Sequence, residues 1–220
     1  MTQQGRSGRK ATSLAAPDAR RGGSAFVVSV SGTSGAGKSS LIEKAAARLA
    51  SAATLHFDDY VTLGNDIAEI KAWVDGGADL DAITTPGLAE NLRQLRARAA
   101  IRLPGSGRRI APADIVILEE PFGRSRRELS ALIDFAVFIE TPADVALARR
   151  LVREIGAGRE EPARLIGALD LQLKAYLAAG RDAYLAASRA ARDSADLVLD
   201  GMRPVSELVE TLVGEIIRRT

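Results

Sequence analysis

The feature that most restricts how this 220-residue chain can fold is a glycine-rich run at positions 32–39, Gly-Thr-Ser-Gly-Ala-Gly-Lys-Ser. The run satisfies the spacing G-x-x-x-x-G-K-[ST], in which successive main-chain N–H groups curl around phosphate oxygens. A short apolar stretch at 25–30 precedes it, and residues 38–50 have helical composition. A helix that begins at the loop adds its positive end to the ring of amides. The sequence therefore predicts a polyphosphate site between a strand and a helix.

The residue types in the loop predict the ligands as ATP and Mg²⁺. Lys38 is expected to bridge the β- and γ-phosphates, and the Ser39 hydroxyl is expected to ligate the metal. The predicted nucleotide-binding residues of the loop are Gly32, Thr33, Ser34, Gly35, Ala36, Gly37, Lys38, Ser39 and Ser40. The chain has no Asn-Lys-x-Asp motif of the kind that reads guanine and no Leu-Ser-Gly-Gly signature. Both absences argue against the GTPases and ABC-type ATPases that carry those motifs.

Apolar runs that alternate with helical segments predict the fold class. Strands are expected at 25–30, 54–57, 115–118, 136–139 and 195–199, and two short strands around a turn are expected between 100 and 110. An amphipathic helix should follow Asp200-Gly201 and end the chain. Strands of this kind are buried on both faces when the sheet is parallel. The prediction is an α/β protein, a P-loop NTPase three-layer αβα sandwich with a mainly parallel central sheet and a small helical lid.

Composition limits the domain organisation and the function classes. Residues 1–22 carry a net charge of +4, so the remaining residues carry −2 of the total +2. We expect a disordered basic tail at 1–22 and one domain at 23–220, with no nucleic-acid partner because the folded part is close to neutral. The chain lacks cysteine, which excludes disulfides and thiolate chemistry. No apolar run matches a membrane span or a signal peptide, so we expect no membrane association and a cytoplasmic location.

Acidic residues follow two of the expected strands. Asp58 and Asp59 come after the second strand, and Glu119 and Glu120 come after the strand at 115–118. Ligands of parallel α/β sheets bind outside the carboxyl ends of the strands. Mg²⁺ needs hard oxygen ligands, and a hydroxyl acceptor needs a carboxylate that takes its proton. Glu119 and Ser39, with Asp58, are the predicted metal residues, and Asp58 is the predicted base; the alternative is that these acids only begin solvated loops.

A helix rich in arginine is expected after Thr141, which is a suitable N-cap before Pro142. Its apolar residues are predicted to share one face, and its arginines another. The apolar set is Val145, Ala148, Leu151, Val152 and Ile155, and the basic set is Arg149, Arg150 and Arg153. Glycines follow at 156 and 158, as expected for a hinged lid. Arg150 and Arg153 can then stabilise charge on a transferred phosphoryl group, although such a run is also typical of a solvated helix face.

The order of these motifs resembles the uridine kinase and phosphoribulokinase superfamily, which includes small nucleoside and nicotinamide riboside kinases. The motifs that carry the resemblance are the phosphate loop, Phe-Asp-Asp-Tyr at 57–60, Ile-Leu-Glu-Glu at 117–120, the helix at 144–155 and Ala-Asp-Leu-Val-Leu-Asp at 195–200. The resemblance covers residues 25–201. It implies an ATP-dependent phosphotransferase with an alcohol group as acceptor, in which Asp58 is the general base and Glu119 is associated with the metal.

The same resemblance implies where the acceptor and the lid lie. It places the acceptor-binding insertion at about 60–110 and the lid at about 153–163, with Arg150, Arg153 and Arg159 as lid arginines. The substrate-binding residues that it implies are Asp58, Asp59, Tyr60, Asp75 and Arg159. Arg150 is added to the predicted cofactor-binding residues. The predicted catalytic residues are Lys38, Asp58, Arg150 and Arg153.

The chain departs from that family in two places. The hairpin at 100–110 has only Pro104, Gly105, Ser106 and Gly107 at its turn, where uridine kinases present aromatic and histidine side chains. Ala157 also stands where those kinases tend to have a further arginine. We expect a nucleoside-like or ribosyl acceptor, and two alternatives stay open. One is a kinase of a non-nucleoside metabolite such as a vitamin precursor, sugar or aminocyclitol, and the other is a non-catalytic ATP-binding regulatory protein. Formation of a homo-oligomer is also left open.

Overall fold

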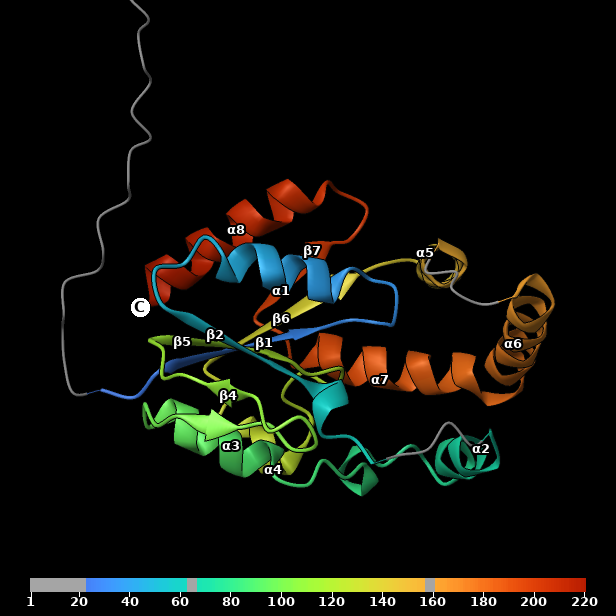
Figure 1. Cartoon of the computed structure of the whole chain (residues 1–220), viewed down its shortest axis with the longest axis horizontal. Helices are drawn as coiled ribbons and strands as arrows, with labels where there is room; N and C mark the ends of the chain where they lie inside the picture. Colours follow the sequence, from blue (N-terminus) through green and yellow to red (C-terminus); the bar gives the residue numbers. More distant parts are fainter. Residues whose placement is uncertain (1–22, 63–66, 157–160) are drawn as a thin grey trace, which may run out of the picture.

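A five-stranded parallel sheet forms the centre of the computed structural model, which describes residues 23–62, 67–156 and 161–220 (Figure 1). The strands are β1 (Phe26–Ser31), β2 (Ala52–His56), β5 (Ile115–Glu119), β6 (Phe135–Glu140) and β7 (Leu197–Asp200). Their order is β2-β5-β1-β6-β7, and every neighbouring pair is parallel. The predicted parallel sheet is therefore confirmed. Strand β2 ends at His56, one residue earlier than expected.

Helices cover both faces of the sheet (Figure 1). Helices α1 (Lys38–Ala46) and α8 (Val205–Arg219) lie on one face, and α3 (Leu88–Arg96), α4 (Arg127–Ser130) and α7 (Arg181–Asp193) lie on the other. Alternate strand residues enter the two cores: Val28 and Val30 pack with α1 and α8, whereas Val27 packs with α3 and α4. Burial on both faces accounts for the continuous apolar strands and confirms the αβα sandwich.

The smaller elements lie around this sandwich. The short strands β3 (Ile101–Arg102) and β4 (Arg109–Ile110) form the antiparallel hairpin that the sequence predicts. Helix α2 (Ile67–Asp75) and the 3₁₀ turns η1 (Phe57–Asp59) and η2 (Leu80–Ala82) lie between β2 and α3 in the chain.

Helical structure after α5 (Ala143–Gly156) is more extensive than the short lid that the sequence predicts. Helix α6 (Pro162–Ala175) passes through one π-helical turn, η3 (Tyr176–Gly180), directly into α7. Figure 1 shows α6 running at an angle to α7, as expected for a helix that bends at a π turn. The lid segment expected at about 153–163 includes residues 157–160, which lie outside the described ranges.

The apolar face predicted for α5 is not buried. Val152 and Ile155 are 69% and 53% exposed, and Ala146 is the buried residue of this helix. The first turns of α5 pack close to the phosphate loop, because the Ala146 carbonyl lies against Gly35. Val152 and Ile155 therefore lie at the protein surface and enter neither core.

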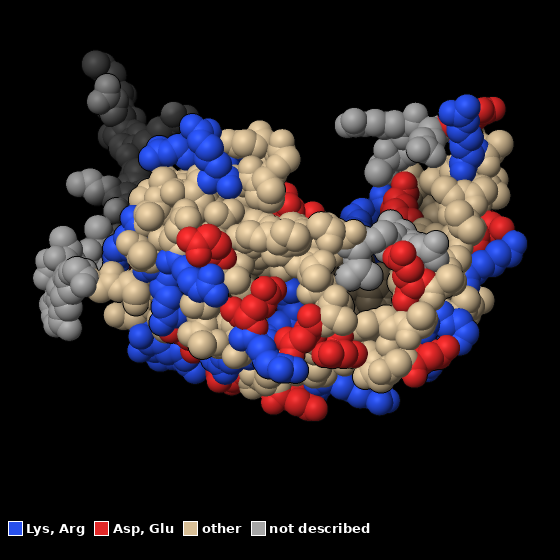
Figure 2. Space-filling view, turned by 90° about the horizontal axis from the view of Figure 1, so that it is seen from below, with Lys and Arg blue, Asp and Glu red and all other residues tan. Residues whose placement is uncertain are grey.

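Charged side chains of both signs are interspersed over the face seen in Figure 2. Within the described ranges, none of the helices has the length and apolar character needed to cross a membrane.

Candidate nucleotide and acceptor site

A cleft of about 460 Å³ opens beside the phosphate loop, at the carboxyl ends of the strands. One side is formed by the loop and the start of α1, and the other side is formed by residues from η1, α2 and α7. Asp58, Glu119 and Arg153 line it together with Lys38 and Ser39. Eight of the nine loop residues predicted to bind the nucleotide line this cleft; the ninth, Ala36, is buried behind them.

The backbone of the phosphate loop depends on glycine. Gly37 has a φ of +97° and sits at the N-cap of α1, in a left-handed conformation that other residues rarely adopt. Gly35 has a φ of +94°, and a Cβ atom there would lie 2.1 Å from the Ala146 carbonyl oxygen. The loop therefore combines a left-handed turn with a close approach to α5. This geometry directs the N-terminus of α1 toward the cleft, as a phosphate site requires.

Lys38 is buried at the base of the cleft. Its Nζ atom donates to the Thr33 carbonyl at 3.2 Å and lies 3.6 Å from Oε1 of Glu119. Burial lowers the pKa of Lys38 and the positive charge of Arg153 acts in the same direction, whereas Glu119 and Asp58 oppose the shift. The amine is thus placed between the loop and the two carboxylates that the sequence singles out.

Glu119 is the last residue of β5 and connects three polar groups. Its Oε2 atom accepts from the Ser39 hydroxyl at 3.4 Å and lies 2.8 Å from Nδ1 of His56. Burial by itself would raise the pKa of Glu119, but the His56 hydrogen bond and the charge of Lys38 outweigh it and lower the pKa. The structure therefore brings Ser39 and an ionised Glu119 together.

The donor set suits Mg²⁺, which binds hard oxygens and usually keeps water and phosphate ligands. Ser39 and Glu119 are the residues placed to hold it, and Asp58 lies on the same cleft. The described residues include no group of three or more histidine, cysteine or acidic side chains arranged to hold a metal by themselves. A metal here would complete its coordination with phosphate oxygens and water.

His56 is a site residue that the sequence reasoning missed. It is the last residue of β2, and the parallel register pairs it directly with Glu119 on β5. The Glu119 hydrogen bond raises the pKa of His56, while burial opposes the rise. The sequence signal that could have revealed the pair is that His56 and Glu119 each end a strand. The sequence alone, however, does not state that β2 and β5 are neighbours, because 63 residues separate the pair.

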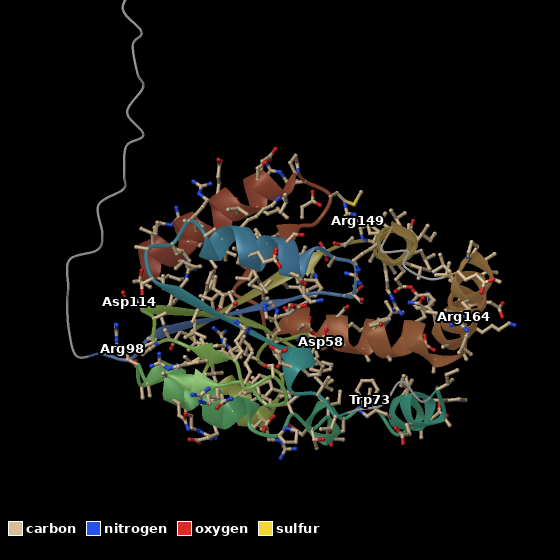
Figure 3. The ribbon with its side chains drawn as sticks, in the orientation of Figure 1. Asp58, Trp73, Arg98, Asp114, Arg149 and Arg164 are labelled. Carbon is tan, nitrogen blue, oxygen red and sulfur yellow. The ribbon has the colours of Figure 1, made fainter. Side chains whose placement is uncertain are left out.

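Asp58 and Asp59 lie in η1, immediately after β2, and both are exposed. Asp58 lines the cleft, and Figure 3 shows it beside the end of the sheet. Asp59 is not among the lining residues. The structure therefore separates the two neighbouring carboxylates, and Asp58 is the one that a reacting group in the cleft can meet.

The prediction that Arg150 and Arg153 act from the same face is wrong for this conformation. Arg153 lines the cleft, whereas Arg150 lines a separate small pocket beside Thr33 and Ser34. Arg150 is held there by Tyr184, whose hydroxyl accepts from Nη1 at 2.8 Å, and by Glu154, which accepts from Nε at 3.2 Å. These contacts turn Arg150 away from the cleft. Arg159 lies outside the described residues.

Two further expectations for the acceptor site are corrected. Tyr60 is 3% exposed and belongs to the core, where its hydroxyl accepts from Asn91 at 2.9 Å. Asp75 is exposed and pairs with Lys71, and it does not line the cleft. Trp73, two residues earlier on α2, does line it and lies between α2 and α7 in Figure 3. Positions two apart on a helix point to different sides, so Trp73 and Asp75 cannot share the cleft wall.

Glu120 is structural, unlike its neighbour Glu119. Its carboxylate is fully buried and receives two bonds from Arg126, from Nη2 at 2.8 Å and from Nε at 3.2 Å. Arg126 also donates to the Ile83 carbonyl at 3.0 Å and to the Thr85 hydroxyl at 2.9 Å. Burial raises the pKa of Glu120 against the opposing charge of Arg126. The pair ties the end of β5 to the segment that places Ile83 in the cleft.

Comparison with known proteins shows similarity to uridine kinases. The chain is 32% identical to a uridine kinase of Brevibacillus brevis over 111 residues, which are 49% of each protein. It is 25% identical to uridine kinase-like protein 3 of Arabidopsis thaliana over 152 residues, 63% of this chain and 33% of that protein. The chain is a P-loop protein similar to uridine kinases. The matches span about half or less of these relatives, and no family model matches the sequence.

A solved structure is also similar. Shikimate kinase from Acinetobacter baumannii, solved in complex with shikimate, superposes with a TM-score of 0.49 at 14% identity. The alignment covers 89% of this chain and 95% of that one. The strand order and the phosphate loop of the chain itself define its fold.

Proposed function

We propose that this protein transfers the γ-phosphate of ATP to a hydroxyl group of a small molecule. The observation that carries the proposal is that Asp58 faces the same cleft as the phosphate loop, Lys38 and the Ser39–Glu119 pair. A carboxylate at that position is suited to take the proton of an acceptor hydroxyl. The partial similarity to uridine kinases supports the same reaction class.

The proposed reaction follows from the placement of these groups. The loop amides and Lys38 hold the triphosphate. Ser39 and Glu119 are the residues that would hold Mg²⁺, which would supply positive charge against the phosphates. Asp58 orients the acceptor hydroxyl and takes its proton. The acceptor oxygen then forms a bond to the γ-phosphorus while the bond from that phosphorus to the β–γ bridging oxygen breaks, which releases ADP. Lys38 and Arg153 stabilise the negative charge that shifts toward ADP.

The similarity to uridine kinases supports a nucleoside-like or ribosyl acceptor. A specific observation favours the second candidate, a kinase of a non-nucleoside metabolite such as a vitamin precursor, sugar or aminocyclitol. The β3–β4 hairpin, whose turn lacks aromatic and histidine side chains, contributes no residue to the cleft lining. Asp58 in the cleft argues mildly against the third candidate, a non-catalytic regulatory protein that binds ATP.

Acceptor-stimulated release of ADP tests the proposal. The full chain should release ADP from MgATP faster when a suitable alcohol is added, and Lys38→Ala should lower this rate by about 10²–10³-fold or more, because a buried cation at the transferred phosphate is lost. Lys44→Ala is a matched control, since Lys44 is an exposed residue in the last turn of the same helix. Binding of MgATP without stimulation by any alcohol would support the regulatory alternative.

A further inference from the structure

The part of the cleft farther from the phosphate loop is walled by apolar side chains. They come from η1, α2, the segment after η2 and the segment after β5, and they are Phe57, Val61, Ile70, Trp73, Ile83 and Phe122. The opposite wall is one face of η3 and α7, where Gly180, Ala183 and Ala187 follow at helical spacing. Small residues on that wall leave room for a flat or bulky group. We call this region the acceptor half of the cleft.

Three polar groups near the acceptor half are already paired within the protein. The indole N–H of Trp73 donates to the Asp79 carbonyl at 2.7 Å. The Tyr184 hydroxyl accepts from Arg150 at 2.8 Å. Arg126 lies against the Phe57 and Phe122 rings, 5.6 Å and 5.9 Å from their centroids, but it is fully buried and bonded to Glu120. Within the described lining, a bound molecule would therefore meet mainly ring and aliphatic surfaces, with the Asp58 carboxylate and the Ser188 hydroxyl as polar groups on the same cleft.

The charges in the cleft also restrict the acceptor. Among the lining residues that the structure describes, the cations are Lys38 and Arg153. Lys38 lies in the phosphate loop, and the charge of Arg153 acts on it. The proposed reaction assigns both cations to the transferred phosphoryl group, so under it neither serves an anionic group on the acceptor. The acceptor half instead presents Asp58, which repels a carboxylate or phosphate.

We propose, on the basis of the phosphotransferase function above, that the acceptor is an uncharged alcohol whose non-reacting part is an apolar ring. The ring is held by apolar contact between the α2 side and the α7 side of the cleft, and its edge is not read by hydrogen bonds. Among the acceptors named above, this favours ring-bearing nucleosides and vitamin precursors over free sugars and aminocyclitols, because the described wall offers few polar groups to replace the water that a polyol loses. Anionic alcohols are disfavoured as well.

Acceptor kinetics with the full chain test this proposal. The probes are 2-phenylethanol and cyclohexylmethanol, the nucleosides uridine and cytidine, D-ribose, and glycerol 3-phosphate. The expected kcat/KM is at least about tenfold higher for the two ring alcohols than for D-ribose or glycerol 3-phosphate. Uridine and cytidine differ only at the edge of the base, so their kcat/KM values should agree within about threefold. A preference of more than about tenfold between these nucleosides, or for an anionic or sugar acceptor, overturns the proposal.

A binding measurement separates this proposal from the proposed reaction. Trp73 is the single tryptophan of the chain and lines the acceptor half, so its fluorescence reports directly on occupancy. Cyclohexylmethanol should change the fluorescence saturably at a concentration at least about tenfold lower than D-ribose does. If no alcohol stimulates ADP release, the proposed reaction fails and this titration alone decides the acceptor class. Equal or stronger binding of D-ribose overturns the inference.

A variant of the wall gives a second test. Ile70→Ser places a hydroxyl in the apolar wall and should raise KM for the ring alcohols by about fivefold, with unchanged affinity for MgADP. Lys71→Ala on the same helix is the control, because Lys71 pairs with Asp75 away from the cleft. An Ile70→Ser variant that has the parent KM for ring alcohols contradicts the proposal.

Discussion

The two halves of the cleft are built from different parts of the chain. The phosphate half lies beside the loop at 32–40, and the acceptor half lies farther from that loop. The phosphate half uses eight of the nine residues at 32–40, among them Lys38, together with the Ser39–Glu119 pair. The acceptor half uses side chains from η1, α2, the segment after β5 and α7, more than 100 residues apart in the sequence. Main-chain amides recognise phosphate in almost any nucleotide, whereas side-chain walls can change without disturbing the loop. In the proposed function, one half accounts for the reaction class and the other for the choice of acceptor.

Asp58 lies where these halves meet. Apart from the loss of Lys38, its substitution should cause the largest decrease in kcat. Asp58→Asn should lower kcat by about 10²–10⁴-fold, because the proton of the acceptor hydroxyl loses its base. The affinity for MgADP should stay within about twofold of the parent. Steady-state kinetics and calorimetric titration measure the two quantities.

Asp59→Asn is the control for this variant, since Asp59 is the adjacent exposed carboxylate and does not line the cleft. A kcat for Asp58→Asn equal to that of the parent would show that the base assignment is wrong. Asp58 would then not connect the acceptor to the phosphate half.

The second prediction concerns the buried ion pair between Arg126 and Glu120. Arg126 lies against the Phe57 and Phe122 rings of the acceptor half. Arg126→Met leaves the buried Glu120 carboxylate without its partner and should lower the free energy of unfolding by about 3–5 kcal/mol. Chemical denaturation measures this loss. The double variant Arg126→Met/Glu120→Gln should recover part of it, because a neutral amide costs less to bury than an unpaired charge.

If Arg126→Met unfolds at the same denaturant concentration as the parent, the ion pair does not support the acceptor half. Arg127→Ala is a matched control at the neighbouring position, where the side chain is 87% exposed and its pair with Asp81 should contribute little.

The smallest expected loss of stability concerns the ion pair between Arg124 and Asp196. Arg124, two residues after Phe122, donates to Asp196 from Nη1 at 2.9 Å and to the Asp134 carbonyl from Nη2. Burial by itself would raise the pKa of Asp196, but the bonds from Arg124 and the Ala136 amide outweigh it and lower the pKa. A lowered pKa means that the folded state favours the carboxylate, so the contribution to stability is present above the ordinary value of 3.8 and is lost as pH falls through the folded-state pKa.

Asp196→Asn should therefore reduce the unfolding free energy by about 1 kcal/mol at pH 7, since the pair is partly exposed. The difference between variant and parent should shrink when denaturation is repeated below pH 3.8. A difference that is constant from pH 7 to pH 3 would exclude a role for the charge of Asp196 in holding this segment.

Much of the phosphate half was predictable because its residues are consecutive. The spacing of Gly32, Gly37, Lys38 and Ser39 determines the loop, and the strand before it and helix after it were expected from composition and are present. The positions of Asp58 and Glu119 on the cleft followed from the rule that parallel strands end at the same edge. The parallel sheet and the β3–β4 hairpin were also predicted.

The sequence did not determine which side chains meet across the fold. The His56–Glu119 pair depends on the register of β2 against β5, and the turning of Arg150 toward Tyr184 depends on how α5 packs beside α7. The family resemblance implied that Tyr60 and Asp75 bind the acceptor, but packing buries the first and helical phase turns the second outward.

The sequence by itself determined where phosphate is held, because a left-handed glycine turn and a ring of amides are properties of neighbouring residues. Only the tertiary structure decided the character of the acceptor half, because Phe57, Trp73, Phe122 and Ala183 become neighbours only when the sheet, α2 and α7 are packed together. The geometry of a loop depends on a few consecutive residues, whereas the wall of a cavity depends on contacts between residues that are distant in the sequence.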